Sequence, residues 1–243
     1  IHVNCLGDFR VFVNGVEINP SSWKTKKVES LFKFLVIERR QHHKEKIIEE
    51  FWPDAEPHLG DVSLRMALTN IRKALGLTGE CLVLKRGMIS LNPEIKIYTD
   101  YELFTSTAQQ AIQDRDLDNP ACLDLLEQAA GLYRGEFLPD DIYNDWTAGL
   151  RAQLHKLYLQ VLSRKVEILR RQGRLIPAIE VCRLYLDLEP TDEPVCRTAM
   201  ELLWQTGQKQ QALSVYKELT AYIAKEFNSS PSSETIALYE KIK

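Results

Sequence analysis

A repeat of 34 residues in the second half of the chain restricts the folds open to it. Gly173 and Gly207 stand 34 residues apart, and the same offset relates Ala178 to Ala212. Matched positions follow at that offset, namely Ile179 with Leu213, Cys182 with Tyr216, and Tyr185 with Leu219. This period is typical of tetratricopeptide helix pairs, in which a glycine permits the interhelical turn and a small alanine lets two helices approach. We therefore expect stacked helix pairs, with Pro190 closing one of them; an irregular helical bundle is the alternative.

Helical sequence continues from Tyr98 to the last residue. Breakers divide it at Gly135 with Pro139, Gly173, Pro190, Gly207 and Pro231. They predict helices at 100–114, 120–133, 143–172, 175–188, 193–206, 208–226 and 232–242. We expect the aromatic residues of this half to pack mostly in the core rather than to anchor a partner: Tyr143, Trp146, Trp204, Tyr216 and Tyr222.

Strands and helices are mixed in the first 98 residues. Apolar and polar residues alternate up to Val13, and Asn14-Gly15 is a strong hairpin-turn pair. A helical stripe follows, made by Val28, Leu31, Phe32, Leu35 and Val36. A shorter helix stops at Pro53. A third helix is expected from about Leu59 to Leu75, where Gly76 ends it.

A short hairpin with a basic tip, Lys85-Arg86-Gly87, follows the third helix. Strands, three helices and a two-stranded ribbon, in this order, are typical of a winged helix-turn-helix domain, whose third helix enters the major groove of DNA. The fold class is therefore mainly α with a small β component. We expect a winged helix-turn-helix at residues 1–98 and an all-α, tetratricopeptide-like domain at residues 99–243.

The third helix has an outward face suited to reading base pairs. With Leu64, Leu68, Ile71 and Leu75 inward, a helical wheel places six residues on that face and its flank: Arg65, Met66, Thr69, Asn70, Arg72 and Lys73. Arginine bonds bidentately to guanine and asparagine to adenine, while threonine and methionine contact the thymine methyl group. Lys73, Lys85 and Arg86 suit phosphate contacts. A merely solvated helix face is the alternative.

The net charge of −3, from 31 basic and 34 acidic residues, conceals two unlike halves. Residues 1–98 carry 15 basic and 12 acidic residues, whereas residues 99–243 carry 16 and 22. A mildly basic half suits nucleic acid, and an acidic one does not follow phosphates. Because an excess of +3 is modest, we expect tight DNA binding to need two protomers or help from polymerase.

Several other classes of protein are excluded by the sequence. No apolar run approaches the ~18 residues of a membrane helix, and no secretory signal is visible. The scattered cysteines Cys5, Cys81, Cys122, Cys182 and Cys196 predict buried, reduced thiols of a cytoplasmic protein. The adjacent pair His42-His43 lacks nearby metal ligands. Nucleotide-binding and hydrolase motifs are absent, so we expect neither an enzyme nor a bound cofactor.

Distinctive short motifs occur along almost the whole chain. In the first half they are Leu6-Gly7-Asp8-Phe9, Asn14-Gly15, Lys26-Lys27, Phe51-Trp52-Pro53-Asp54 and the run from Leu64 to Gly76. In the second half they are the run from Leu132 to Pro139, Asp145-Trp146, Leu188-Glu189-Pro190 and Pro231-Ser232-Ser233-Glu234-Thr235. Together these motifs resemble those of the antibiotic-regulatory (SARP, AfsR-like) bacterial transcriptional activators. One departure is Glu226-Phe227-Asn228, where the family has Glu-Leu-Gly; Asn228 is still expected to take the left-handed turn.

The resemblance implies an OmpR-type winged helix joined to a bacterial transcriptional activator domain with tetratricopeptide-like repeats. It implies a sequence-specific activator that binds double-stranded promoter repeats and recruits RNA polymerase, with Arg65, Thr69, Asn70, Arg72 and Lys73 in recognition-helix positions. Residues 53–60 would form the loop that contacts polymerase in OmpR-type relatives. The helical domain would serve a homodimer or a regulatory protein. The same two-domain unit also occurs within longer regulators, and the start at Ile1 leaves that open here.

A protein-interaction module is the alternative function. In it, the winged helix would dock a partner protein rather than DNA. The net negative charge and the acidic second half favour this reading. A pull-down that is unaffected by charge reversal at Arg65, Arg72 and Lys73, together with no gel shift, would favour the interaction module.

Overall fold

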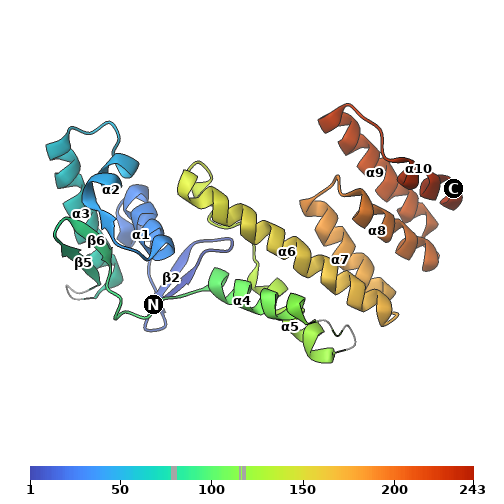
Figure 1. Cartoon of the computed structure of the whole chain (residues 1–243), viewed down its shortest axis with the longest axis horizontal. Helices are drawn as coiled ribbons and strands as arrows, with labels where there is room; N and C mark the ends of the chain where they lie inside the picture. The colour runs from blue at the N-terminus through green and yellow to red at the C-terminus, as the bar shows by residue number, and fades with distance from the viewer. Residues whose placement is uncertain (78–80, 115, 117–118) are drawn as a thin grey trace. The chain divides into compact units, whose positions relative to one another are not determined.

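The computed structural model describes residues 1–77, 81–114, 116 and 119–243, and it is mainly helical (Figure 1). By packing, the chain divides into two compact units. The first comprises Ile1–Leu103 and Arg134–Ala152, and the second comprises Phe104–Tyr133 and Gln153–Lys243. The domain boundary at residue 98 stays a prediction, since the packing units place Arg134–Ala152 with the first half of the chain.

A small sheet with strand order β3-β2-β1-β7 contains both ends of the first 99 residues. Its strands are β1 (His2–Asn4), β2 (Arg10–Val13), β3 (Val16–Glu17) and β7 (Tyr98–Thr99). β2 pairs antiparallel with β1 and with β3, and β7 pairs parallel with β1. Asn14 and Gly15 connect β2 to β3 with φ of 51° and 82°, which confirms the predicted hairpin turn.

Three helices lie wholly within the first unit, namely α1 (Lys26–Glu38), α2 (Lys44–Phe51) and α3 (Pro57–Leu75). A short 3-10 turn, η1 (Pro20–Trp23), precedes α1. Thr25 begins α1, because its hydroxyl accepts a hydrogen bond from the Val28 amide at 3.2 Å. The whole predicted stripe of α1 is buried, from Val28 to Val36. α3 begins at Pro57, two residues before the predicted start, since proline is well suited to a first helical position.

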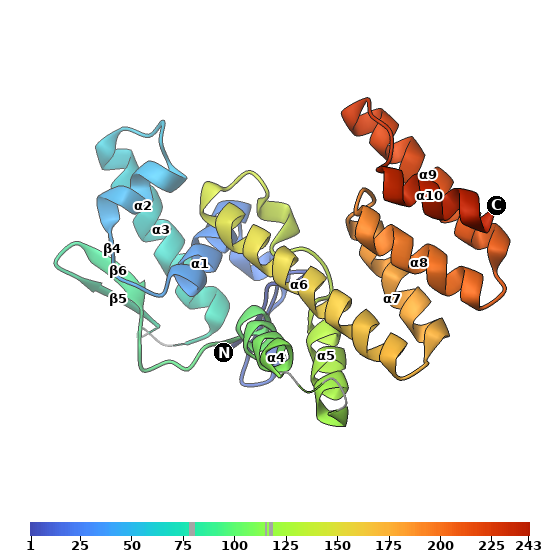
Figure 2. The same ribbon diagram turned by 45° about the vertical axis from the view of Figure 1, so that its right-hand side comes forward.

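A second sheet has the strand order β4-β6-β5 (Figure 2). In sequence, β4 lies between α1 and α2, and β5 and β6 follow α3. Its strands are β4 (His42–His43), β5 (Leu82–Lys85) and β6 (Met88–Leu91), all paired antiparallel. β5 and β6 form the hairpin that the sequence predicts. Ile89 and Leu91 of β6 are buried, so the hairpin contributes to the core of the unit.

The segment Arg134–Ala152 docks on the first sheet through backbone contacts. The Gly7 amide donates to the Glu136 carbonyl at 2.9 Å, and the Leu138 amide donates to the Cys5 carbonyl at 2.9 Å. A Cβ on Gly135 would lie 3.2 Å from the Cα of Gly7, so the two backbone segments approach closely at this point. The 3-10 turn η2 (Pro139–Asp141) follows within this segment.

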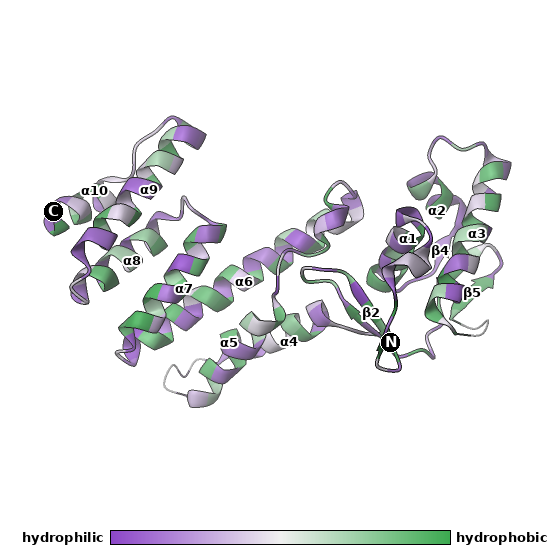
Figure 3. Cartoon of the chain, turned by 180° about the vertical axis from the view of Figure 1, so that it is seen from behind, coloured by the Kyte–Doolittle hydropathy of each residue, from purple (hydrophilic) through white to green (hydrophobic). Residues whose placement is uncertain are grey.

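Helices form the remainder of the chain, close to the predicted ranges. They are α4 (Asp100–Gln113), α5 (Pro120–Leu132), α6 (Asp145–Arg171), α7 (Leu175–Leu188), α8 (Glu193–Gln205), α9 (Lys209–Phe227) and α10 (Ser233–Ile242). Each mixes hydrophilic and hydrophobic residues, as expected of helices with one buried face (Figure 3). No helix in the described residues is long and apolar enough to cross a membrane.

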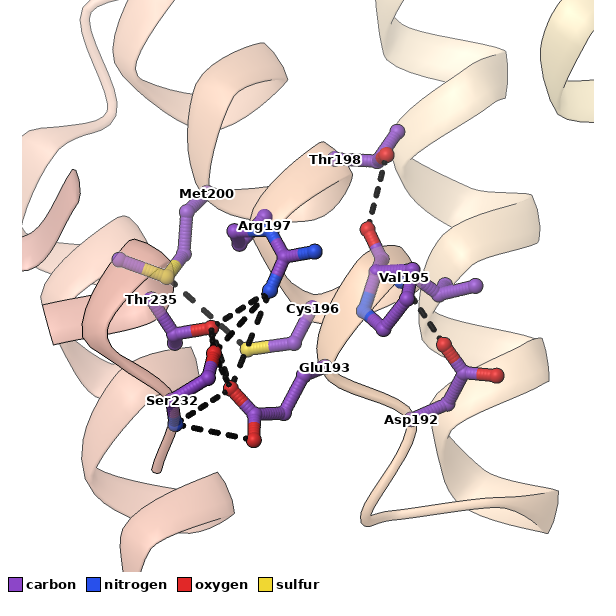
Figure 4. Close-up of polar contacts among 10 residues, drawn as sticks. Asp192, Glu193, Val195, Cys196, Arg197, Thr198, Met200, Ser232 and Thr235 are labelled. Carbon is purple, nitrogen blue, oxygen red and sulfur yellow. Dashed lines mark hydrogen bonds and ion pairs between the residues drawn. The ribbon is translucent and has the colours of Figure 1, made fainter. Parts of the chain in front are cut away.

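The 34-residue repeat corresponds to two successive helix pairs in the second unit. Gly173 and Gly207 form the turns of α6 with α7 and of α8 with α9, at φ of 72° and 77°. Ala178 and Ala212 are fully buried where the paired helices meet. Asn228 ends α9 in the left-handed conformation, at φ of 48°, as predicted. α10 then packs against α8 and α9, held by Glu193, Ser232 and Thr235 (Figure 4).

Two predictions about side-chain environments have different outcomes. All five cysteines are buried free thiols, as expected. The prediction for the aromatic residues is wrong for Tyr143, which is 92% exposed, and for Tyr222 and Trp204, which are 45% and 37% exposed. Tyr143 lies in the turn after η2, where a helical period does not apply.

Candidate nucleic-acid interface

Helix α3 is held in place by a buried apolar stripe and by defined ends. Leu64, Leu68, Ile71 and Leu75 are buried, as the helical wheel predicts. Gly76 ends the helix in the left-handed conformation, at φ of 62°. The buried face of α3 therefore holds the helix in place, and its opposite face is exposed to solvent.

Four of the predicted contact residues lie on the exposed face of α3. Arg65, Met66, Thr69 and Lys73 are exposed, and Met66 is 62% exposed. The Thr69 hydroxyl donates to the Arg65 carbonyl at 2.9 Å, so this donor is already engaged within the helix. The structure thus brings these four side chains onto one surface.

Two other predicted residues, Asn70 and Arg72, are half-buried at the margin of this surface. Arg72 lies close enough to Cys81, the residue before β5, for its charge to favour the thiolate there. Burial nevertheless dominates and raises the pKa of the Cys81 thiol. Asn70 and Arg72 are therefore less accessible than the helical wheel implies.

The tip of the β5–β6 hairpin carries the remaining predicted cations. Lys85 and Arg86 are both exposed. Arg86 and Gly87 form the two-residue turn, with φ of 53° and 76°, so the hairpin has the shortest common connection. The wing is accordingly short, as the sequence indicates.

Lys44, the first residue of α2, connects this hairpin to α3. Its backbone amide donates to the Gly87 carbonyl at 2.9 Å, and its side-chain ammonium lies 3.0 Å from the Asp61 carboxylate on α3. Neither contact was foreseen from sequence, because a basic residue at a helix start has many alternative roles. The contact fixes the turn of the hairpin relative to the first turns of α3.

The cations of this surface are available for a ligand. In the part of the chain that the structure describes, Arg65, Arg72, Lys73, Lys85 and Arg86 form no ion pair with a carboxylate. No acidic residue occurs between positions 62 and 79 of the sequence. A surface of this kind attracts anions and lacks the internal partners that neutralise most surface cations.

An apolar stripe on α3 adds to the polar surface and was missed by the sequence analysis. Leu59, Val62 and Met66 are spaced by three and four residues and are 50%, 45% and 62% exposed. Their spacing was visible in the sequence as a second apolar line, offset from the buried one. Such a stripe suits contact with methyl groups or with an apolar protein surface.

His42 lies in the core beside this surface. It is 8% exposed, and its ring lies 4.6 Å from that of Phe34. Burial and then the nearby Arg40 lower its pKa, so the neutral ring is favoured. His42 and His43 together form β4, in which His43 alone is exposed.

Two known proteins are similar to this chain over most of its length. The "Regulatory protein AfsR" of Streptomyces griseus is 23% identical over 198 residues, which are 81% of this chain and 20% of AfsR. The solved structure of EmbR from Mycobacterium tuberculosis, in complex with a low-affinity phosphopeptide, matches 99% of this chain and 64% of that chain, with a TM-score of 0.73 and 21% identity. The chain therefore spans a fifth of the length of AfsR and under two thirds of the EmbR chain.

A family model covers the second part of the chain. Residues 99–243 match the bacterial transcriptional activator domain, and these residues include every helix of the 34-residue repeat. The α3 surface lies outside the matched range. With more than half of its length matched, the chain belongs to the bacterial transcriptional activator domain family.

Proposed function

We propose that this chain is a sequence-specific DNA-binding transcriptional activator whose first 98 residues form a winged helix-turn-helix. The observation that carries the proposal is the exposed face of α3, which presents Arg65 and Lys73 without a carboxylate partner in the described residues. The order of three helices followed by the β5–β6 hairpin supports it, since this order places a recognition helix beside a wing. The similar AfsR is a regulatory protein by name, and membership of the bacterial transcriptional activator domain family supports the same role.

The side chains of α3 and of the hairpin tip have two different roles in this proposal. Arg65 would read guanine and Asn70 adenine in the major groove, with Met66 and Thr69 against thymine methyl groups. The engaged Thr69 hydroxyl leaves its methyl group as the outward contact. Arg72, Lys73, Lys85 and Arg86 would bind phosphates and hold the register.

Recruitment of RNA polymerase belongs to the same proposal. The segment from Pro53 to Gly60 is matched to the loop that contacts polymerase in OmpR-type proteins, but only residues 53–56 precede the helix, because α3 begins at Pro57. Here Asp54 and Glu56 are exposed in it, next to the exposed Leu59. A second protomer on adjacent repeats would supply the affinity that the modest charge of one winged helix does not provide.

Selection of bound sequences from a random duplex pool, followed by footprinting, tests DNA binding directly. We expect an enriched site, with repeats near one helical turn apart if protomers bind side by side. Reversal of charge at Arg65 and Lys73 to glutamate should abolish the footprint, whereas Arg10→Glu on β2 should not. Absence of any enriched sequence would contradict the proposal.

A protein-docking role is the second candidate. The exposed stripe of Leu59, Val62 and Met66 favours it, and so does the phosphopeptide in the EmbR complex. More than a third of the EmbR chain is not matched by this chain, and the phosphopeptide could be bound there. The phosphopeptide alone therefore does not distinguish protein docking from DNA binding. A pull-down that survives charge reversal at Arg65, Arg72 and Lys73, together with no gel shift, would favour docking.

A further inference from the structure

An apolar hollow of about 370 Å³ opens between α6, α7 and α8 in the second unit. Its apolar walls are Val166 of α6, Tyr185 of α7 and Val195 of α8. Pro194 and Thr198 extend the wall along α8. The hollow lies entirely within the stacked helix pairs, away from α3 in sequence and in packing unit.

A second hollow of about 480 Å³ continues the first along α6. It is lined by Ile112 of α4 and by Lys156, Leu159 and Gln160 of α6. Ser163, Glu167 and Tyr185 line both hollows, so the two lie next to each other. We call the two hollows together the α6 groove.

The groove is rigid where its two halves meet. The Tyr185 hydroxyl donates to Asp192 at 2.9 Å, and Asp192 also accepts from the Val195 amide at 3.0 Å to begin α8. Tyr185 is 8% exposed, and burial, followed by its hydrogen bond to Asp192, raises its pKa to about 12. The phenol therefore stays neutral, and the groove floor requires little ordering when a ligand binds.

The rim of the α6 groove is positively charged on a half of the chain that is acidic. Residues 99–243 carry 22 acidic and 16 basic residues. The groove is nevertheless bordered by Lys156, Arg164 and Arg170, with Glu167 as its acidic lining residue. Lys156 is exposed and has no carboxylate partner in the described residues.

Of the two arginines of the rim, Arg170 retains charge that a ligand can use. Arg164 lies 2.8 Å from Glu167, which balances one of the three rim cations. Arg170 lies 3.6 Å from Glu201, with both side chains over 40% exposed, so this pair is open to water and weak. The groove thus combines an apolar floor with a cationic border.

We propose that the α6 groove binds a peptide segment of a partner protein in which apolar anchor residues alternate with aspartate or glutamate. The floor takes the apolar anchors, and Lys156 and Arg170 attract the acidic residues. Stacked helix pairs provide the extended surface that such segments require. This site is independent of DNA binding, since none of its residues lies on α3 or on the hairpin.

Fluorescence polarisation with three defined labelled peptides tests the proposal on the full chain. The first is a 12-residue peptide of alternating leucine or tryptophan with aspartate or glutamate. The second replaces its acidic residues with lysine, and the third replaces its apolar residues with serine. We expect saturable binding of the first peptide alone, roughly tenfold or more above the others, and weakening as salt is raised.

Variants of the protein locate the binding. Lys156→Glu with Arg170→Glu should weaken the acidic peptide by roughly tenfold. Ser163→Trp, an exposed position shared by both hollows, should block the groove without changing charge. The matched control Lys217→Glu with Lys225→Glu alters exposed lysines of α9 that line neither hollow, and it should bind as wild type.

Three results would overturn the proposal. The first is no saturable binding of the acidic peptide by a folded wild-type chain. The second is equal affinity for the acidic and lysine peptides. The third is a chain that binds no peptide but forms a dimer, where both groove variants abolish the dimer. That result would assign the groove to contact with a second copy of the chain. Circular dichroism of each variant shows whether its helices are retained.

Discussion

The ammonium group of Lys33 on α1 lies 2.7 Å from the carboxylate of Asp141, 108 residues later in the chain. The two side chains are 2% and 4% exposed. Lys33 also lies 2.6 Å from Glu29, and the Ser30 hydroxyl donates to Asp141 at 2.7 Å. This buried cluster fastens the segment Arg134–Ala152 to the helix that precedes the predicted helix-turn-helix.

Replacement of Lys33 by methionine should destabilise the first unit by about 3 kcal/mol, since breaking a buried ion pair leaves an uncompensated charge. Urea denaturation measures the loss. The double variant Lys33→Met with Asp141→Leu should recover part of it, because both buried charges are then absent. Arg10→Met, which removes an exposed pair with Glu17, should cost under about 1 kcal/mol. Equal losses of unfolding free energy in Lys33→Met and Arg10→Met would contradict this account.

Gly60 of α3 is required by the close approach of α2. A Cβ at this position would lie 2.5 Å from the Cγ2 atom of Ile48. We expect Gly60→Ala to cost about 1–3 kcal/mol in thermal or urea unfolding, as overpacking does. Adding Ile48→Ala removes the clashing methyl group, so the double variant should be more stable than the sum of the two single losses predicts.

Gly131 of α5 supplies the matched control. A Cβ there would meet no atom within 4 Å, and its helix conformation suits alanine. Gly131→Ala should therefore stabilise the protein by about 0.4–1 kcal/mol. If both glycine variants changed stability in the same direction, steric contact with Ile48 would not be the cause.

Local periodicity predicted the elements of this fold, because each helix shows its buried face in its own sequence. Leu64, Leu68, Ile71 and Leu75 fixed the outward face of α3, and the offset of Gly173 and Gly207 revealed the helix pairs. The prediction was weaker where a position depends on a distant segment. Lys33 stands between two phenylalanines, yet nothing local shows that Asp141 is its partner.

Surfaces assembled from several helices were not visible in the sequence, because each helix contributes only a few of their residues. The α6 groove takes residues from α4, α6, α7 and α8, and each of these helices alone is an ordinary amphipathic helix. Tyr143 follows a 3-10 turn, so helical spacing gave no information about its exposure. Half-burial of Asn70 and Arg72 likewise depends on the tertiary neighbours of α3, which a helical wheel leaves out.

Base-reading and phosphate-binding residues should differ in a binding assay. Arg65→Ala should relax the preference at one base pair of the selected site, by about 1–3 kcal/mol of discrimination. Lys85→Ala on the hairpin should weaken all duplexes alike and lower the salt slope by about one unit. Anisotropy titrations on single-base variants of the site, at several salt concentrations, separate these effects. A uniform loss in Arg65→Ala would assign Arg65 to phosphate contact instead.

Glu193 of α8 secures the start of α10 (Figure 4). Its two carboxylate oxygens accept from the Ser232 amide at 2.9 and 3.0 Å, and the hydroxyls of Ser232 and Thr235 also donate to it. Burial raises the pKa of Glu193, but the hydrogen bonds from Ser232 and Thr235 outweigh burial, so the pKa lies below its ordinary value of 4.5. The folded state therefore favours the ionised carboxylate.

A group with a lowered pKa stabilises the fold above its unfolded pKa, and that stabilisation is lost as the pH falls through the folded value. We therefore expect α10 to lose protection from hydrogen exchange as the pH falls below about 4.5, ahead of α7. Glu193→Gln should weaken α10 by about 1.5–3 kcal/mol at neutral pH, the range for hydrogen bonds to charged groups, and should remove this pH dependence. Glu234→Gln, at an exposed position in the first turn of α10, should retain it. An unchanged acid response in Glu193→Gln would show that another carboxylate controls the helix.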